Sequence, residues 1–272
     1  MGIPVKQRGE VISNEIRSRI AIRYKTVTRS INKAFWDMES DTLHSLYVGS
    51  YGRGTAIDDS DIDILMELPE VEYNRFDAVW GNGQSRLLQA VRSAILESYP
   101  RSDVRADGQV VKIAFSDGMK FEILPAFKRI SYDGAWDGQY TYPDTNMGGN
   151  WLSTNPKAEQ KAMQDKNKSS NGLLNDTCKH FRSIRNDYFG SYHLLGIVID
   201  SFVYAAIQGW RWTLDSQTSS AAEGDYERAL RAYLEKISPW YHLESPGSDQ
   251  ALNTSKSIDC LIKVVDLIAG QK

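Results

Sequence analysis

The spacing of apolar residues predicts a long amphipathic helix near the start of the chain. The apolar positions recur at intervals of three and four and share one face: Ile12, Ile16, Ile20, Tyr24, Val27, Ile31 and Phe35. Cations fall largely on the other faces: Arg17, Arg19, Arg23, Lys25, Arg29 and Lys33. We interpret these cations as a solvated surface. The alternative, a ridge that binds nucleic acid, fits poorly with the overall charge.

Strict alternation predicts a strand over residues 61–68, which Pro69 ends. One face would carry Asp61, Asp63, Leu65 and Glu67, and the other Ile62, Ile64, Met66 and Leu68. A short apolar strand is expected over residues 46–48. The glycine-rich segment 49–59 between them is expected to be a loop or the start of a short helix.

Two further strands are expected over residues 110–115 and 120–124. Asp117-Gly118 between them favours a hairpin turn, because both residues tolerate positive φ. On the second of these strands Glu122 would face away from its apolar neighbours Phe121 and Ile123.

The rest of the chain is predicted to be mostly helical, with two irregular segments. The helices are expected over residues 75–99, 157–168, 172–188, 191–210, 224–237 and 248–269. Residues 131–155 show no period and are expected to form a long loop, and residues 213–223 an exposed polar loop. The pattern therefore predicts an α/β half, to about residue 130, packed on a helical half.

Composition and charge limit the classes of function. The 272 residues are 41% hydrophobic and 25% charged, which is enough for a core without disulfide or zinc staples. With 32 Lys and Arg against 35 Asp and Glu, the net charge is −3, which argues against broad binding of duplex nucleic acid but not against a local basic pocket. Cys178 and Cys260 form no CxxC pair. No apolar run has the length of a signal peptide or a membrane span, so we expect a soluble, cytoplasmic protein.

The candidate chemistry lies in Gly49-Ser50, Asp61-x-Asp63 and Glu122. Asp61 and Asp63 are two residues apart on one strand, and a neighbouring strand can bring Glu122 beside them. Three close carboxylates repel one another unless cations bind between them, and Mg²⁺ prefers such oxygen ligands. Gly49 and Ser50 would let backbone N–H groups and a hydroxyl approach a triphosphate. Each piece alone is also typical of a turn or a solvated strand, but the ordered set predicts a site for nucleotidyl transfer.

These residues resemble a known family. The run GSYGRGTAIDDSDIDILMEL is similar to the GS and DxD signature of polymerase-β-type nucleotidyltransferases. The stretches KFEILPAF, YTYPDTNMGGNWLSTNP and GLLNDTCKHFRSIRND resemble the bacterial cGAS/DncV-like nucleotidyltransferases (CD-NTases, SMODS domain), over about Pro4 to Ile207. The resemblance implies an α+β fold: a polymerase-β-like core over residues 1–150, with a mixed sheet and a long N-terminal spine helix, packed on a helical bundle over residues 151–272.

The resemblance also implies roles for individual residues. Asp61, Asp63 and Glu122 would be catalytic and hold two Mg²⁺ ions, with Mn²⁺ as a substitute. The nucleotide-binding set would be Gly49, Ser50, Arg53, Lys179, Arg182, Ser191 and Tyr192. Lys179 and Arg182 share a helix face and are equally compatible with a surface cation pair. Ser191-Tyr192-His193 resembles an SSYH stretch in the animal relative, where the serine contacts phosphate and the tyrosine stacks on a base. Core packing of Tyr192 is the alternative.

Two features depart from the family pattern. The third carboxylate is Asp in much of the superfamily and Glu122 here, which moves the ligand outward. The Cys/His zinc insertion of the animal DNA sensor is absent, so no activation by double-stranded DNA is expected.

The implied function is a cyclic dinucleotide synthase of anti-phage (CBASS) signalling. It would join ATP and GTP, or other NTPs, into a second messenger such as cyclic GMP–AMP. The product would act on a downstream effector, for which a SAVED-domain nuclease is a candidate, and no membrane partner is expected. Two alternatives stay open: transfer of a single nucleotide to an RNA end or to a small-molecule or protein hydroxyl, and an inactive nucleotide-binding module.

Overall fold

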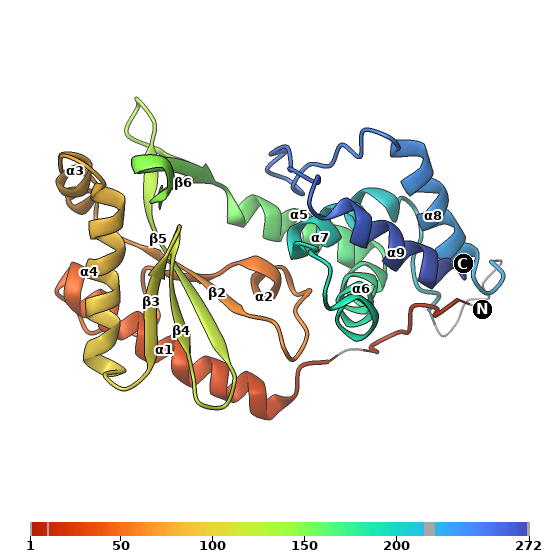
Figure 1. Ribbon diagram of the computed structural model, residues 1–272, viewed down its shortest axis with the longest axis horizontal. Helices are drawn as coiled ribbons and strands as arrows, with labels where there is room; N and C mark the ends of the chain where they lie inside the picture. The colour runs from red at the N-terminus through yellow and green to blue at the C-terminus, as the bar shows by residue number, and fades with distance from the viewer. Residues whose placement is uncertain (1, 10, 215–220, 271–272) are drawn as a thin grey trace. The chain divides into compact units, whose positions relative to one another are not determined.

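The computed structural model describes residues 2–9, 11–214 and 221–270. The chain divides into two compact units. The sheet unit comprises Ser13–Gly52 and Asp58–Lys157, and the helical unit comprises Met1–Ile12, Arg53–Ile57 and Ala158–Lys272. Figure 1 labels α1–α9 and β2–β6.

The sheet unit is built on a mixed sheet with the strand order β1-β2-β5-β4-β3, extended by β6 on β5 and by β7 on β6. The strands are β1 (Ser45–Tyr47), β2 (Ile62–Glu67), β3 (Asp103–Asp107), β4 (Val110–Ala114), β5 (Lys120–Ile130), β6 (Trp136–Asp144) and β7 (Asn150–Thr154). β2 and β5 are parallel, and every other pair is antiparallel. The α+β fold class is therefore confirmed.

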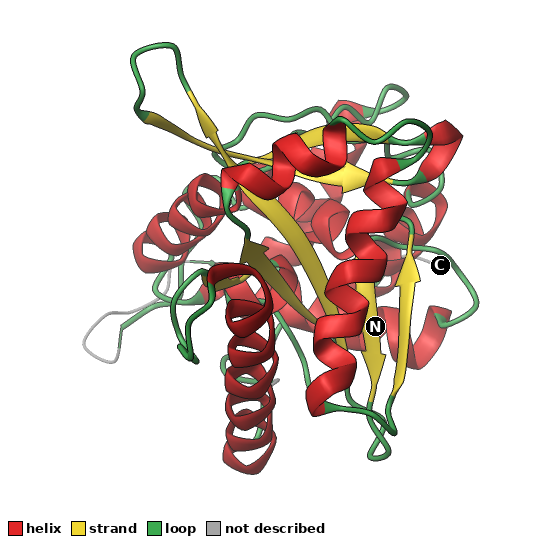
Figure 2. Cartoon of the chain, turned by 90° about the vertical axis from the view of Figure 1, so that its left-hand side faces the viewer, coloured by secondary structure: helices red, strands yellow, loops and turns green. Residues whose placement is uncertain are grey.

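Helices cover one face of this sheet (Figure 2). They are α1 (Asn14–Trp36), α3 (Glu70–Asp77) and α4 (Gly83–Ser98). The core between helices and sheet contains Ile20 and Ile31 of α1, Leu88 of α4 and Ile64 and Ile123 of the sheet, all at most 2% exposed. Burial of this apolar surface is the main force that holds the helices against the strands.

The opposite face of the sheet carries a smaller apolar cluster of Val48, Leu65, Ala126 and Tyr140. Leu65 lies two residues after Asp63 on β2, so the two side chains share a face. On the face of the sheet that carries Asp63, apolar side chains therefore pack together from Leu65 onward.

The helical unit has its own core, around Phe181, Phe202 and Leu261. Its helices are α5 (Pro156–Ser169), α6 (Leu173–Phe189), α7 (Gly196–Ala206), α8 (Asp225–Ile237) and α9 (Ile258–Ala269). The N-terminal segment belongs to this unit: Val5 is 7% exposed, and its backbone N–H donates to Glu227 Oε1 at 2.9 Å.

Four expectations about elements are wrong. The helix expected over 75–99 is two helices, α3 and α4, because Gly81-Asn82 breaks it and Asn82 caps α4. The loop expected over 131–155 contains β6 and β7, and β3 was not foreseen. The helices expected over 191–210 and 248–269 start later, at Gly196 and Ile258. Part of the loop expected over 213–223 lies outside the described residues.

Candidate active site

Gly49 and Asp63 are in direct contact. The backbone N–H of Val48 donates to Asp63 O at 2.9 Å, which fixes the end of β1 beside β2. At Gly49, φ is +58°, and a Cβ placed there would lie 1.7 Å from Asp63 Oδ2. Only glycine fits this position, because any side chain would displace the carboxylate. α2 (Gly49–Arg53) begins here, with Ser50 in its first turn.

Asp63 and Glu122 lie on the same face of the sheet. They are directly paired in the parallel register of β2 and β5. Their neighbours Ile62, Ile64 and Phe121 point to the other face and are at most 2% exposed. Adjacent strands are about 4.8 Å apart, so the two carboxylates project side by side from neighbouring strands.

Asp61 is placed differently. It immediately precedes β2, which begins at Ile62, and it is exposed. In the part of the chain that the structure describes, no three acidic, histidine or cysteine side chains converge into a group that would hold a metal ion. The structure thus brings Asp63 and Glu122 together but does not close the expected triad around Asp61.

Glu122 has a cationic partner that sequence reasoning missed. Lys112 of β4 is directly opposite Glu122 in the antiparallel register, and its Nζ lies 3.3 Å from Glu122 Oε1. The same Nζ lies 2.8 Å from Asp107 Oδ2 on β3. The hydrogen bond to Asp107, together with the nearby Glu122, raises the pKa of Lys112 although partial burial opposes this. The available signal was the alternation Val111, Lys112, Ile113, which puts the lysine on the polar face.

Two predicted nucleotide-binding residues of the helical unit belong to a buried ion cluster. Arg53 donates from Nε to Asp200 Oδ2 at 2.8 Å and from Nη1 to Glu159 Oε2 at 3.1 Å. Arg182 donates from Nη1 to Asp200 Oδ1 at 2.7 Å and from Nη2 to the carbonyl of Gly196 at 3.0 Å.

The charges in this cluster are balanced around Asp200, whose side chain is fully buried. Burial by itself would raise the pKa of Asp200, but Arg182 and Arg53 outweigh it and hold that pKa below its usual value. Burial dominates at Glu159 and raises its pKa despite Arg53. Both guanidinium groups are held by internal carboxylates, so their predicted contacts with a triphosphate remain predictions without structural support.

The other predicted residues of the helical unit are more accessible. Lys179 is half-buried on α6. Ser191 and Tyr192 lie in the connection between α6 and α7, not at the start of a helix. The side chain of Tyr192 is 41% exposed, and Lys263 Nζ lies 5.1 Å from its ring centroid. Tyr192 is thus not a core residue, which disfavours the core-packing alternative.

The comparison with protein families decides the class of the chain. The model of the Second Messenger Oligonucleotide or Dinucleotide Synthetase domain, SMODS, matches residues 10–167, more than half of the chain. The chain belongs to this family. SMODS proteins of the CD-NTase group are nucleotidyltransferases, so the prediction of an enzyme of this class is confirmed. The matched region includes Gly49, Asp63 and Glu122, but it ends before Lys179 and Tyr192.

Solved CD-NTase structures share the fold of this SMODS protein at low identity. The Elizabethkingia meningoseptica CdnE cyclic dinucleotide synthase, solved with GTP and Apcpp, is 14% identical, with a TM-score of 0.62 over 92% of this chain and 89% of that one. The Rhodothermus marinus CdnE c-UMP-AMP synthase, with Apcpp and Upnpp, is 15% identical, with a TM-score of 0.61 over 96% and 97%. A mutant of the Vibrio cholerae di-nucleotide cyclase DncV is 13% identical, with a TM-score of 0.64 over 95% and 85%.

No curated protein matches the SMODS chain. None of its described helices has the length and apolar character that crossing a membrane requires.

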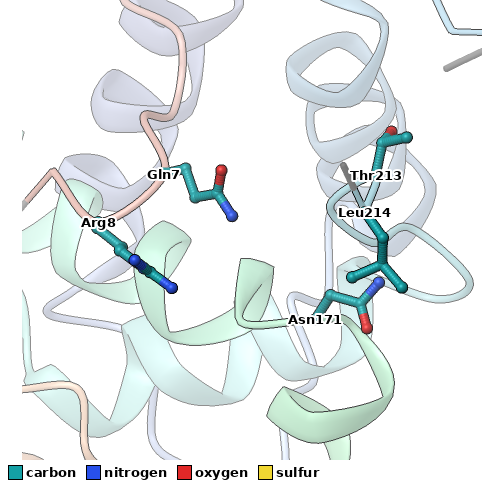
Figure 3. Close-up of a pocket in the computed structure, with 5 residues that line it drawn as sticks. All are labelled: Gln7, Arg8, Asn171, Thr213 and Leu214. Atoms are coloured by element: carbon teal, nitrogen blue, oxygen red, sulfur yellow. The ribbon is translucent and has the colours of Figure 1, made fainter. Parts of the chain in front are cut away.

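A pocket in the helical unit is lined by none of the predicted site residues (Figure 3). It has a volume of about 340 Å³ and is lined by Gln7, Arg8, Asn171, Thr213 and Leu214. None of these five residues belongs to the nucleotide-binding set expected for a SMODS protein. The pocket therefore adds nothing to the assignment of the active site.

Proposed function

We propose that this SMODS protein joins two nucleoside triphosphates into a cyclic dinucleotide, with release of pyrophosphate at each of two nucleotidyl transfers. The observation that carries the proposal is the pairing of Asp63 with Glu122 on one sheet face, with Gly49 packed against the Asp63 carboxylate. Membership of the family supports the reaction class, and this pairing supports the proposed location of the site.

The donor set fits divalent cations, which proteins of this family generally use. Carboxylate oxygens are the ligands that Mg²⁺ and Mn²⁺ prefer. Asp63 and Glu122 would hold the ions, joined by Asp61 at the start of β2. When bound, Mg²⁺ would help ionise the attacking hydroxyl and stabilise the charge on the leaving pyrophosphate.

The chain itself contributes positioning. The absence of a side chain at Gly49 lets the Asp63 carboxylate lie directly against the backbone. Ser50, in the first turn of α2, would offer its hydroxyl and the nearby backbone N–H groups to a phosphate chain. In the helical unit, Lys179 would neutralise phosphate charge and the exposed ring of Tyr192 would stack on a base. Catalysis would then depend mainly on orientation and charge neutralisation.

The substrates and biological role are a finer part of the proposal. We infer ATP and GTP as the substrate pair and a cyclic GMP–AMP with mixed 2′/3′ linkages as the product, from the resemblance around KFEILPAF. The CdnE relatives were solved with GTP and Apcpp, or with Apcpp and Upnpp, so nucleotide choice varies among similar folds. The product would serve as a second messenger in anti-phage defence.

The test is product analysis with the protein and labelled NTPs alone. The wild-type chain, incubated with ATP, GTP, CTP and UTP plus Mg²⁺ or Mn²⁺, should give a phosphatase-resistant cyclic product, identified by mass spectrometry after nuclease digestion. Asp63→Asn should lower its formation by at least about a hundredfold. A reaction that required an added RNA or small-molecule acceptor would indicate single-nucleotide transfer. Undiminished product formation by Asp63→Asn would refute the assignment of the site.

A further inference from the structure

Lys112 connects two carboxylates on the face of the proposed active site. It lies opposite Glu122, with Val111 and Ile113 on either side fully buried on the other face. Its side chain is 46% exposed, so the ammonium group reaches the solvent edge of the carboxylate face. Asp107, its second partner, comes from the neighbouring strand β3 and is 63% exposed.

The two ion pairs are unequal. Lys112 Nζ lies 2.8 Å from Asp107 Oδ2, which is hydrogen-bond distance, but 3.3 Å from Glu122 Oε1. A lysine side chain is flexible and its ammonium group can rotate among acceptors. Asp107 therefore offers a partner that can retain Lys112 when the Glu122 carboxylate turns to another cation.

We propose that Lys112 is a positioning residue that competes with divalent cations for Glu122, and that Asp107 sets the strength of this competition. This inference rests on the proposed function, because it takes Glu122 as a cation ligand. While no cation is bound, Lys112 holds the Glu122 carboxylate beside Asp63 and offsets their mutual repulsion. On cation binding, Glu122 exchanges the ammonium for the ion and Lys112 remains on Asp107.

Substitutions of Lys112 and Asp107 are expected to change the affinity for Mn²⁺ moderately and in opposite directions. Removal of the competing charge in Lys112→Met should tighten Mn²⁺ binding roughly fivefold, since partly exposed ion pairs are weak but the charge is close. Asp107→Asn removes the alternative partner, so Lys112 stays on Glu122 and Mn²⁺ binding should weaken severalfold. In the Lys112→Met background, Asp107→Asn should have little effect, because Asp107 acts through the lysine.

Matched controls separate these local effects from general changes in charge. Lys120 lies two residues before Glu122 on the same face of β5, so Lys120→Met removes an equal charge but leaves Lys112 paired with Glu122. Asp103 is on the same face of β3 as Asp107 but pairs with Arg105, so Asp103→Asn is the control for the acidic side. Both controls should change Mn²⁺ affinity less than the matched variant.

The measurement is Mn²⁺ binding without nucleotide, followed through the electron paramagnetic resonance signal of free Mn²⁺, on folded variants verified by circular dichroism. Tighter binding in Lys112→Met than in Lys120→Met, together with the non-additive effect of Asp107→Asn, would support the proposal. If Glu122→Gln reduces Mn²⁺ binding but Lys112→Met binds Mn²⁺ no more tightly than the wild type, the proposed role of Lys112 is overturned. The proposed cation site is then unaffected. Wild-type binding that Glu122→Gln does not alter would overturn this inference and the proposed cation site together.

Discussion

The backbone of Gly49 approaches Asp63 so closely that residue identity, backbone conformation and carboxylate position depend on one another. A Cβ at position 49 would overlap Asp63 Oδ2, at 1.7 Å, and φ is +58°, where other residues are strained. The need for glycine at position 49 is local, yet it determines where the Asp63 carboxylate on β2 lies. A sequence pattern can indicate that Gly and Asp occur together, but only the pairing of β1 with β2 shows that they touch.

Gly49→Ala should therefore disable the site without unfolding the protein. The added methyl group would displace the Asp63 carboxylate by about an ångström, which costs on the order of a hundredfold in activity when a reacting group is misplaced. The measurement is initial rate of cyclic product formation beside the melting temperature. Gly118→Ala is the control, because Gly118 has φ +87° but nothing within 4 Å of a Cβ. An equal loss of activity in both variants would contradict a specific role for Gly49.

At the scale of elements, the sequence pattern predicts strands with one uniform apolar face and fails where that face is interrupted. The alternation of Ile62, Ile64 and Met66 predicts β2 correctly. β6 has its own alternation, with Trp136, Tyr140 and Tyr142 on one face, but Gly138 interrupts this apolar face and conceals the period. Its pairing with β5 and β7 supplies the backbone hydrogen bonds that make it a strand.

The connection between β6 and β7 explains the glycine at position 149, which lies in the stretch YTYPDTNMGGNWLSTNP that resembles the family. Gly149 has φ +101°, and a Cβ there would lie 2.4 Å from Gln84 Oε1 and 2.8 Å from Asn82 Oδ1. Asn82 Oδ1 accepts from Ser85 N at 2.9 Å and so caps α4, and its Nδ2 donates to Thr145 O at 2.8 Å. The glycine is required because the connection between β6 and β7 passes close to the start of α4.

Gly149→Ala is expected to destabilise the protein by about 2 kcal/mol, through backbone strain and disturbance of the Asn82 cap. Urea unfolding followed by circular dichroism would measure the loss. Gly148 provides the comparison, since it has φ +92° and nothing within 4 Å of a Cβ. Gly148→Ala should cost about 1 kcal/mol, the strain alone. Equal losses would show that the contact with Asn82 and Gln84 contributes nothing.

At the scale of the whole molecule, the division into units is discontinuous in sequence. Met1–Ile12 and Arg53–Ile57 belong to the helical unit although they flank the first segment of the sheet unit. Contacts distant in sequence hold them there, among them the hydrogen bonds from Val5 N to Glu227 Oε1 and from Thr55 Oγ1 to Asp200 Oδ2 at 3.0 Å. Composition and periodicity report only neighbours along the chain, so they could not predict these contacts or the internal partners of Arg53 and Arg182.

The buried carboxylates of this cluster should respond differently to neutralisation. The pKa of Asp200 is lowered, so its charge stabilises the folded state, whereas the pKa of Glu159 is raised by burial. Asp200→Asn leaves Arg53 and Arg182 without their shared counter-charge and should lower the free energy of unfolding at pH 7 by about 3 kcal/mol. Glu159→Gln should change it by less than about 1 kcal/mol, because the charged form of Glu159 is itself disfavoured by burial.

The pH dependence of unfolding provides an independent check on these assignments. Because the pKa of Asp200 lies below its ordinary value of 3.8, its stabilising contribution is complete above that pH and is lost as the pH falls through the lower, folded-state value. The pH dependence of Glu159 is opposite: it binds its proton more readily in the folded state, so acidification toward pH 4.5 adds stability.

Urea unfolding from pH 7 to about 3 provides the measurement. The difference in the free energy of unfolding between wild type and Asp200→Asn should narrow only at the acid end. Any excess in the free energy of unfolding of Glu159→Gln over the wild type at pH 7 should vanish as the wild-type carboxyl group protonates. A gap for Asp200→Asn that stays constant to the lowest pH would mean that the charge of Asp200 does not stabilise the cluster.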